Sequence, residues 1–174
     1  SQWNLLLVKI LRGCRKIKKF MIDKKFYAPT LSSYALNITE CKDIEEEINF
    51  SIKNNKVSSD ASKELKKIRR NIDICEGRIK EKLNKFLTSS TNKKYIQEFI
   101  ISKRDDRFVI PIKSSFKNEV QGTILDTSSK GSTVFIEPQS ISKYSLELIS
   151  LKSEESIEEY KILSYLTELI YDKI

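Results

Sequence analysis

The sequence of 174 residues contains no histidine, and it has only four glycines, three prolines and three cysteines. Histidine is the side chain best suited to proton transfer near neutral pH, and it is the commonest metal ligand. Without it, the histidine-dependent pairs that activate serine and cysteine nucleophiles cannot form. The composition also excludes collagen-like and low-complexity chains. Catalysis by this chain is therefore not expected.

The three cysteines, Cys14, Cys41 and Cys75, are far apart in the sequence and form no C-x-x-C pair. An odd number without that spacing argues against a zinc site and against the disulfide framework of a secreted protein. Cys14 and Cys75 fall within helical apolar patterns, so we expect them to pack as small hydrophobic side chains.

Long hydrophobic runs are also missing. The longest, over residues 3–11, is interrupted by Asn4 and Lys9 and is too short to span a bilayer. It also lacks the basic leader of a signal peptide, so we expect a cytoplasmic protein without a membrane partner. Because the chain has no initiating methionine and a helical pattern starts near its first residue, we expect it to be a piece of a longer protein.

Positive charge is what the chain has in excess, with 32 lysine and arginine residues and a net charge of +8. Residues 1–30 carry a net charge of +7 and residues 61–120 a net charge of +8, and the segments between and after these blocks are acidic. Such blocks suggest a polyanionic partner. Most of the basic residues are lysine, which is also common on solvated surfaces. Charge alone leaves nucleic-acid binding and simple solubility equally open.

Apolar residues recur at steps of three and four over residues 3–26, which predicts a helix that ends before Pro29. A second helix is expected over residues 31–54. The third helix is the clearest, because its heptad stripe should pack against a long partner helix. The stripe consists of Leu65, Ile68, Ile72, Cys75, Ile79, Leu83 and Phe86. A last helix over residues 140–173 has the length to run back and cover that stripe.

Between the third and the last helix, the apolar period changes to two, which is the period of a strand. Two alternating runs flank residues 104–107 and predict a β-hairpin. Its second strand should lie at a sheet edge, because Pro111 cannot donate a hydrogen bond. Residues 122–126 and 132–136 predict two more strands, joined by a loop at 127–131.

The expected fold class is α+β and predominantly α, with long helices in a coiled-coil-like arm and a small inserted antiparallel β-sheet. We divide the chain into four segments. They are an N-terminal helical core segment at 1–58, a long helix at 59–94, the sheet insertion at 95–138 and a returning helix at 139–174.

The glycines and aspartates form no catalytic motif. Gly122 and Gly131 are too far apart for a phosphate-binding loop. Residues 127–131 are best explained as a hairpin loop, with a backbone nest for an anion as the alternative. Asp105 and Asp106 are explained by turn chemistry without a metal ion. We expect no catalytic, cofactor-binding or metal-binding residue in this chain.

The basic residues of the hairpin and of the loops after it are better candidates, for nucleic-acid binding. Residues of one parity share a face of a strand, and one face of the second hairpin strand carries Arg107, Val109, Pro111 and Lys113. Such a surface could follow a phosphate backbone, while Phe108 or Phe116 stacks on a base. The candidates are Lys103, Arg104, Arg107, Lys113, Lys117 and Lys130. The alternative is that the two arginines pair with the neighbouring aspartates and stabilise the turn.

Two long motifs resemble a known family. They are RDDRFVIPIK at residues 104–113 and GTILDTSSKGSTVFIEP at residues 122–138. Both resemble stretches of the second bacterial branch of the MutS-like ATPase family, and looser similarity covers essentially the whole chain. The chain departs from the family's pattern where Asp106 replaces a turn glycine, where Lys130 replaces a serine, and where residues 143–145 replace an asparagine pair.

The resemblance implies that the chain is the core and lever region of a much larger protein. Family members carry a MutS-type ATPase domain after this region, which uses ATP and Mg and drives homodimerisation, and usually a C-terminal nuclease domain. They lack the mismatch-reading domain of repair MutS proteins. The family is linked to the suppression of homologous recombination through branched DNA and to the splitting of collided ribosomes. DNA, ribosomal RNA and a second copy of the whole protein are the implied partners.

Two hypotheses follow. In the first, the chain is a non-catalytic arm that transmits nucleotide-driven motion and helps to clasp DNA or ribosomal RNA. In the second, it is a purely structural coiled-coil scaffold for protein–protein or dimer packing, and its charges only keep it in solution. An independent enzyme would need turnover by this chain alone, which no motif predicts.

Overall fold

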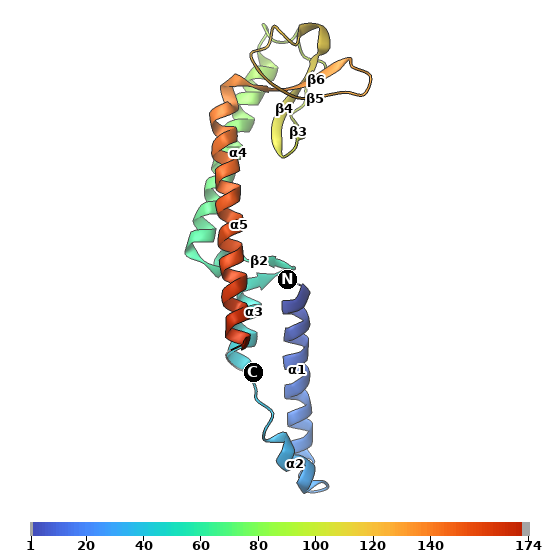
Figure 1. Ribbon diagram of the computed structural model, residues 1–174, viewed down its shortest axis with the longest axis vertical. Coiled ribbons are helices and arrows are strands. Elements are labelled where there is room, and N and C mark those ends of the chain that lie inside the picture. The colour runs from blue at the N-terminus through green and yellow to red at the C-terminus, as the bar shows by residue number, and fades with distance from the viewer. Residues whose placement is uncertain (1, 172–174) are drawn as a thin grey trace. The chain divides into compact units, whose positions relative to one another are not determined.

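The computed structural model describes residues 2–171. Its α-helices are α1 (Gln2–Asp23), α2 (Pro29–Ala35), α3 (Lys42–Ser51), α4 (Lys63–Thr88) and α5 (Ser142–Tyr171), as Figure 1 shows. Its strands are β1 (Ile52–Lys53), β2 (Lys56–Val57), β3 (Ser102–Arg104), β4 (Arg107–Lys113), β5 (Gly122–Thr127) and β6 (Thr133–Pro138). Helices dominate and the strands form small antiparallel sheets, which confirms the expected α+β, predominantly α fold class.

The chain divides into two compact units. The first contains the described residues up to Lys67 and from Ser156 onward, and the second contains residues 68–155. Both α4 and α5 contribute residues to each unit. Among the described residues, no helix has an apolar stretch long enough to cross a membrane.

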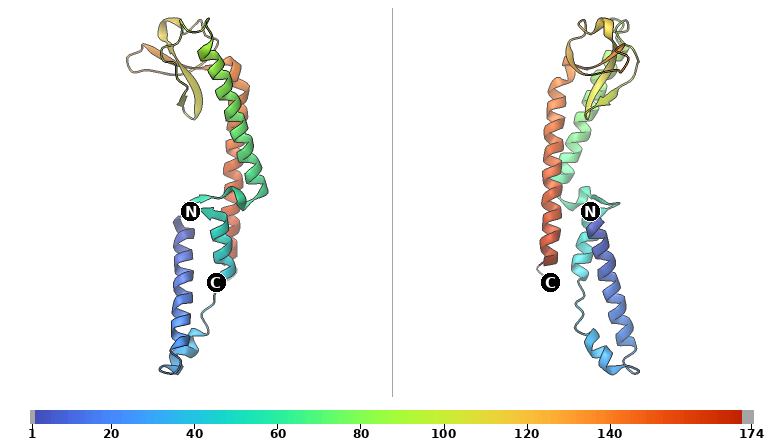
Figure 2. Two further views of the ribbon diagram at one scale, coloured as in Figure 1. Left: turned by 180° about the vertical axis from the view of Figure 1, so that it is seen from behind. Right: turned by 45° about the vertical axis from the view of Figure 1, so that its right-hand side comes forward.

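In the first unit, α1 and α3 lie side by side (Figure 2). Glu45 of α3 accepts a hydrogen bond from Arg12 at 2.6 Å and another from Arg15, both on α1. The hydrogen bond from Arg12 lowers the pKa of Glu45, although burial of the carboxylate acts in the opposite direction. The core of this unit consists of Val8, Ile44, Ile48, Ile52, Val57, Leu65, Ile162 and Leu166.

The helix predicted over residues 31–54 is wrong. Two separate helices, α2 and α3, occupy this region, and residues 36–41 between them are not helical. Asn37 and the β-branched pair that follows it are poor helix formers. In addition, the carbonyl oxygen of Ile38 accepts a hydrogen bond from Lys18 of α1, at 2.8 Å. A side chain from a distant part of the sequence thus takes over a hydrogen bond that the helix would otherwise make.

Residues 52–57 form a small β-hairpin where the end of that helix was predicted. Strands β1 and β2 pair antiparallel directly after α3, with Ile52 opposite Val57. The turn between them consists of Asn54 and Asn55, whose φ angles are 50° and 62°. Asparagine tolerates this left-handed conformation better than most residues, and two such residues in succession form the tight turn that hairpins favour.

The second unit contains a four-stranded antiparallel sheet with the strand order β3-β4-β6-β5. It lies at the end of α4 and the start of α5 (Figure 1). The predicted hairpin is confirmed as β3 and β4, and Asp105 and Asp106 form its turn with positive φ angles. The two predicted strands after it are confirmed as β5 and β6.

The core of the second unit lies between the sheet and the two long helices. It consists of Cys75, Ile79, Leu83, Leu87, Ile96, Phe108, Ile110, Ile112, Val120, Val134, Ile136, Ile141 and Leu148. The Cys75 thiol is buried, as predicted, and donates to the carbonyl oxygen of Tyr144 at 3.3 Å; burial raises its pKa. Arg69 of α4 pairs with Glu155 of α5 at 2.6 Å. Within this unit, α5 therefore lies alongside α4, and its residue Leu148 shares a core with Cys75, Ile79 and Leu83 of α4 and with the sheet.

The prediction that Pro111 marks an edge strand is wrong, because β4 lies between β3 and β6. The carbonyl oxygen of Pro111 accepts a hydrogen bond from the Gln97 backbone at 2.9 Å. In an antiparallel strand, the N–H and C=O of one residue point to the same side. The missing N–H of Pro111 therefore faces the segment before β3, not β6. Because β3 pairs only with residues 107–109, the proline breaks no bond of the main ladder.

Candidate nucleic-acid interface

The two arginines of the predicted site are held by carboxylates from other strands. Arg107 of β4 donates from Nε and Nη2 to the two carboxylate oxygens of Glu137 on β6, at 2.9 and 2.7 Å. The side chain of Glu137 is completely buried. Arg104 of β3 donates to Asp126 of β5 at 2.8 Å, and its guanidinium carbon lies 3.6 Å from the centroid of the Phe135 ring. The buried carboxylate of Glu137 needs such a partner, so its pair with Arg107 stabilises the sheet.

The face of β4 that carries Arg107, Val109 and Pro111 was expected to be exposed, but it is largely covered. Val109 and Pro111 are both buried, so they do not form an open surface with the basic residues. Pro111 lies directly opposite Phe135 in the ladder between β4 and β6. Arg104, which stacks on Phe135, therefore lies on the same face of the sheet as Val109 and Pro111. The two arginine–carboxylate pairs lie on this face as well. The arginines pair with carboxylates, but these come from β5 and β6 and not from the neighbouring aspartates of the turn.

Lys103 lies on the opposite face of β3. Its Nζ is 3.3 Å from a carboxylate oxygen of Glu76 on α4, and it lies 4.4 Å from the centroid of the Phe108 ring. The Phe108 ring itself is buried in the core, so it cannot stack on a base as one expectation had it. Three of the six predicted residues, Lys103, Arg104 and Arg107, therefore have carboxylate partners within the sheet and its helix.

The other three predicted residues lie at the far end of β4. Lys113 ends that strand, Lys117 follows the 3₁₀ turn η2 (Ser114–Phe116), and Lys130 lies in the β5–β6 loop. The loop and the turn are adjacent, because the backbone N–H of Ser114 donates to the carbonyl oxygen of Ser132 at 3.0 Å. The structure therefore brings these three lysines together and separates them from the two arginines.

Two further lysines, which the sequence reasoning missed, join them. The backbone N–H of Lys113 donates to the carbonyl oxygen of Tyr95, and its Nζ donates to that of Lys94, at 2.9 and 3.2 Å. This places Lys93 and Lys94 beside the end of β4. We call the five residues Lys93, Lys94, Lys113, Lys117 and Lys130 the lysine cluster. Within the described part of the chain, none of the five forms an ion pair.

Two aromatic rings lie within the lysine cluster. Tyr95 and Phe116 pack edge to face with their ring centroids 5.4 Å apart, and the Lys94 ammonium lies 4.8 Å from the Tyr95 centroid. Both rings are partly exposed. A basic pair directly before an aromatic residue is the sequence signal that could have drawn attention to this segment. Across residues 2–171, histidine, cysteine, aspartate and glutamate form no cluster of three or more that could hold a metal ion.

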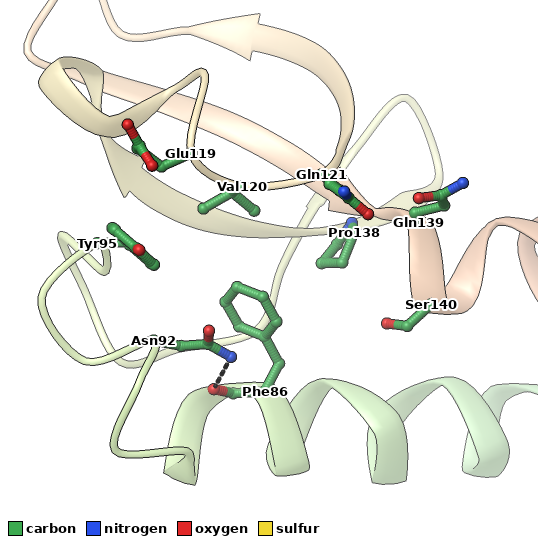
Figure 3. A pocket seen from close by; sticks show the side chains of 9 residues that line it. All are labelled: Phe86, Asn92, Tyr95, Glu119, Val120, Gln121, Pro138, Gln139 and Ser140. Carbon is green, nitrogen blue, oxygen red and sulfur yellow. Dashed lines mark hydrogen bonds between the residues drawn. The ribbon is translucent and has the colours of Figure 1, made fainter.

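Beside Tyr95 lies an open pocket of about 450 Å³, shown in Figure 3. It lies between the end of α4, the start of β5 and the end of β6. Its lining residues are Phe86, Asn92, Tyr95, Glu119, Val120, Gln121, Pro138, Gln139 and Ser140. The Phe86 ring projects from α4 toward Val120, and the polar side chains surround this apolar centre. Tyr95 connects the lysine cluster and the pocket, because its ring contacts the Lys94 ammonium and it also lines the pocket.

Comparisons with known proteins agree with the motifs. No family model matches the chain. Over nearly its whole length, however, the chain is similar to a segment of the MutS-type proteins of several bacteria. The relatives bear the name endonuclease MutS2. The chain is 35% identical to the protein of Alkaliphilus oremlandii over 97% of its length. It is 37% identical to that of Clostridioides difficile over 95%, and 38% identical to that of Alkaliphilus metalliredigens over 96%. The chain spans about 22% of the length of each of these relatives.

Proposed function

We propose that this chain is a non-catalytic segment of a MutS2-type protein, and that it contacts the backbone of a nucleic acid through the lysine cluster. The observation that carries the proposal is the gathering of five lysines at one end of the sheet, without a carboxylate partner in the described structure. Elsewhere in the second unit, Arg69, Arg104 and Arg107 all pair with carboxylates. Unpaired cations close together cost repulsion, which a polyanion would relieve.

The chemistry of lysine suits this role. Lysine acts as a point charge on a flexible stem and binds phosphates without reading sequence. Nucleic-acid binding of this kind is governed by the release of counterions and therefore weakens steeply as the salt concentration rises. The two arginines of the sheet, Arg104 and Arg107, could bind phosphates in a bidentate manner, but they are already occupied by Asp126 and Glu137.

The long helices support a second part of the proposal, that the chain transmits motion as the lever region of the whole protein. α4 contributes Leu65 to the core of the first unit and Cys75, Ile79 and Leu83 to the core of the second. α5 likewise contributes to both cores, through Leu148 and Leu166. A continuous helix that is packed at both ends can carry a displacement from one unit to the other.

For the whole protein, we propose the activities that the family resemblance implies. An ATPase domain outside this chain would use ATP and Mg and form a homodimer, and a separate nuclease domain would account for the word endonuclease in the names of the relatives. The nucleic acid that the lysine cluster contacts would be branched DNA, in the suppression of recombination, or ribosomal RNA, in the rescue of stalled ribosomes.

A structural scaffold is the second candidate function, and exposed apolar side chains on α5 favour it. Leu146, Ile157 and Tyr160 are each more than half exposed. Such residues on one helix are typical of a surface that packs against another protein element. In that case the lysine cluster would have no role in binding.

Fluorescence anisotropy of the 174-residue chain with labelled duplex DNA and with a labelled ribosomal RNA hairpin separates these candidates. The variant Lys113→Gln/Lys117→Gln/Lys130→Gln should weaken binding of either probe by about tenfold or more at low salt. The control Lys66→Gln/Lys67→Gln/Lys161→Gln removes the same charge from ion-paired lysines outside the cluster, and it should have a much smaller effect. Equal losses in the two variants, or no binding at low salt, would leave the scaffold as the better account.

A further inference from the structure

We infer that the pocket beside the lysine cluster admits an unpaired nucleobase, while the phosphates on either side of that base lie on the lysines. The inference rests on the proposed function, because it assigns a more specific ligand to the same surface. It adds that the preferred nucleic acid has unpaired bases, such as a single strand, a loop or the open arm of a branched structure.

The size and the apolar centre of the pocket suit a flat ring. A volume of about 450 Å³ lies within the range of about 300 to 1,000 Å³ that is usual for sites of small organic ligands. Phe86 rises from α4 into the centre, with Val120 and Pro138 across from it (Figure 3). Phe86 and Tyr95 line the pocket and are partly exposed, so a base that enters can contact their rings. Every base has an aromatic face, and stacking on aromatic side chains is the usual way in which proteins hold unpaired bases.

The polar side chains around this centre offer both donors and acceptors. The Asn92 side-chain nitrogen donates to the carbonyl oxygen of Phe86 at 3.2 Å, which leaves its amide oxygen available. The side chains of Glu119, Gln121 and Gln139 make no hydrogen bond within the described residues. Amide side chains pair with the edge of adenine, and a carboxylate accepts a hydrogen bond from an exocyclic amino group. The pocket can therefore bind the edge of a base after the ring has stacked.

The two glutamines are held beside each other by the backbone. The Gln139 N–H donates to the carbonyl oxygen of Gln121 at 3.0 Å. Gly122 follows, opposite Pro138, and an added Cβ there would come within 2.2 Å of the carbonyl oxygen of Glu137. Only glycine permits this close approach of β5 to β6. The approach sets the distance between the glutamines at the edge of the pocket.

Electrostatics favours a nucleotide over an acidic peptide. Glu119 repels carboxylates that enter the pocket, but it accepts hydrogen bonds from the amino groups of bases. The lysines lie outside the pocket, where the Lys94 ammonium faces the Tyr95 ring. A nucleotide fits this order, with its neutral ring inside and its charged phosphate outside. A base within a duplex cannot enter, because it is stacked and paired.

The test compares a 12-nucleotide oligo-deoxyadenylate strand with a 12-base-pair duplex, both titrated against the 174-residue chain by fluorescence anisotropy. The chain should bind the single strand more tightly. Tyr95→Ala should lower single-strand affinity at least about fivefold, which is the effect of removing one stacking platform. Because Tyr95 also packs against the core, a second variant, Gln121→Ala/Gln139→Ala, changes only exposed side chains and should weaken single-strand binding selectively.

A cross-linking measurement locates the base directly. An oligonucleotide with one 5-iodouracil, irradiated with the chain and mapped by mass spectrometry, should cross-link to Phe86 or Tyr95. If both pocket variants bind the single strand as the unchanged chain does, or if the cross-link forms only outside the pocket, the inference is wrong. That result leaves the proposed function intact as long as the lysine-cluster variant still weakens duplex binding. A lysine-cluster variant without effect on either probe would contradict the proposed function itself.

Discussion

The pair formed by Arg107 and Glu137 should stabilise the sheet far more than it contributes to binding. The Glu137 side chain is 0% exposed and its two oxygens accept two hydrogen bonds from Arg107, whose side chain is 29% exposed. Removing one partner of a buried pair typically costs about 3–5 kcal/mol, because the other charge stays buried without a partner. The partial exposure of Arg107 admits some water, so we expect Arg107→Leu to cost about 3 kcal/mol. That is a large share of the roughly 5–15 kcal/mol that stabilises a typical domain.

Urea denaturation followed by circular dichroism measures this cost. Arg104→Leu is the matched control, because Arg104 forms a comparable pair with Asp126 but both side chains are more exposed, at 35% and 46%. Exposed pairs typically contribute only about 0–1 kcal/mol, to which the contact of Arg104 with the Phe135 ring adds roughly 0.5–1 kcal/mol. The double variant Arg107→Leu/Glu137→Leu should be less destabilised than Arg107→Leu alone, since no charge is then left buried. Equal costs for the two single variants would refute this reasoning.

Three further predictions concern other parts of the fold. Gly122→Ala should lower the free energy of unfolding by about 1–3 kcal/mol or more in urea titrations, because the added Cβ overlaps the opposite strand. The pKa of Glu45 is lower in the folded chain than in the unfolded chain, chiefly through Arg12, so its stabilising effect is present at neutral pH and is lost as the pH falls below the usual carboxylate range. Glu45→Gln should therefore lower the Tm at pH 7, and the difference in Tm should shrink as the pH falls through the lowered pKa of Glu45. The buried Cys75 thiol, with its raised pKa, should react with Ellman's reagent only on unfolding, after the two partly exposed cysteines.

The sequence predicts the second unit better than the first. The helical stripe from Leu65 to Phe86 and the strand-like pattern of β4 are local and regular, and α4 and β4 form where these patterns predict a helix and a strand. The break between α2 and α3 depends in part on Lys18, which comes from another helix, so the poor helix formers within residues 36–41 do not reveal it by themselves. The place of β4 inside the sheet likewise depends on which strand pairs with which, and Pro111 is compatible with both arrangements.

The candidate site could also be predicted only in part from the sequence. The sequence places Arg107 and Lys113 on one strand, but it does not show that Glu137, 30 residues later, binds the arginine. Nor does it show that Lys94 meets the end of β4, since that contact depends on a backbone hydrogen bond between Lys113 and Tyr95. Residue type predicts which side chains can bind phosphate. Tertiary contacts decide which of them are free to do so.

The salt dependence of duplex binding tests the central claim most directly. Each lysine that neutralises a phosphate contributes about −0.9 to the slope of log K against log salt concentration. If Lys113, Lys117 and Lys130 all contact phosphates, neutralising the three should make the slope less steep by about 2.7, whereas the control variant outside the cluster should change it little. An unchanged slope in the lysine-cluster variant would contradict the account.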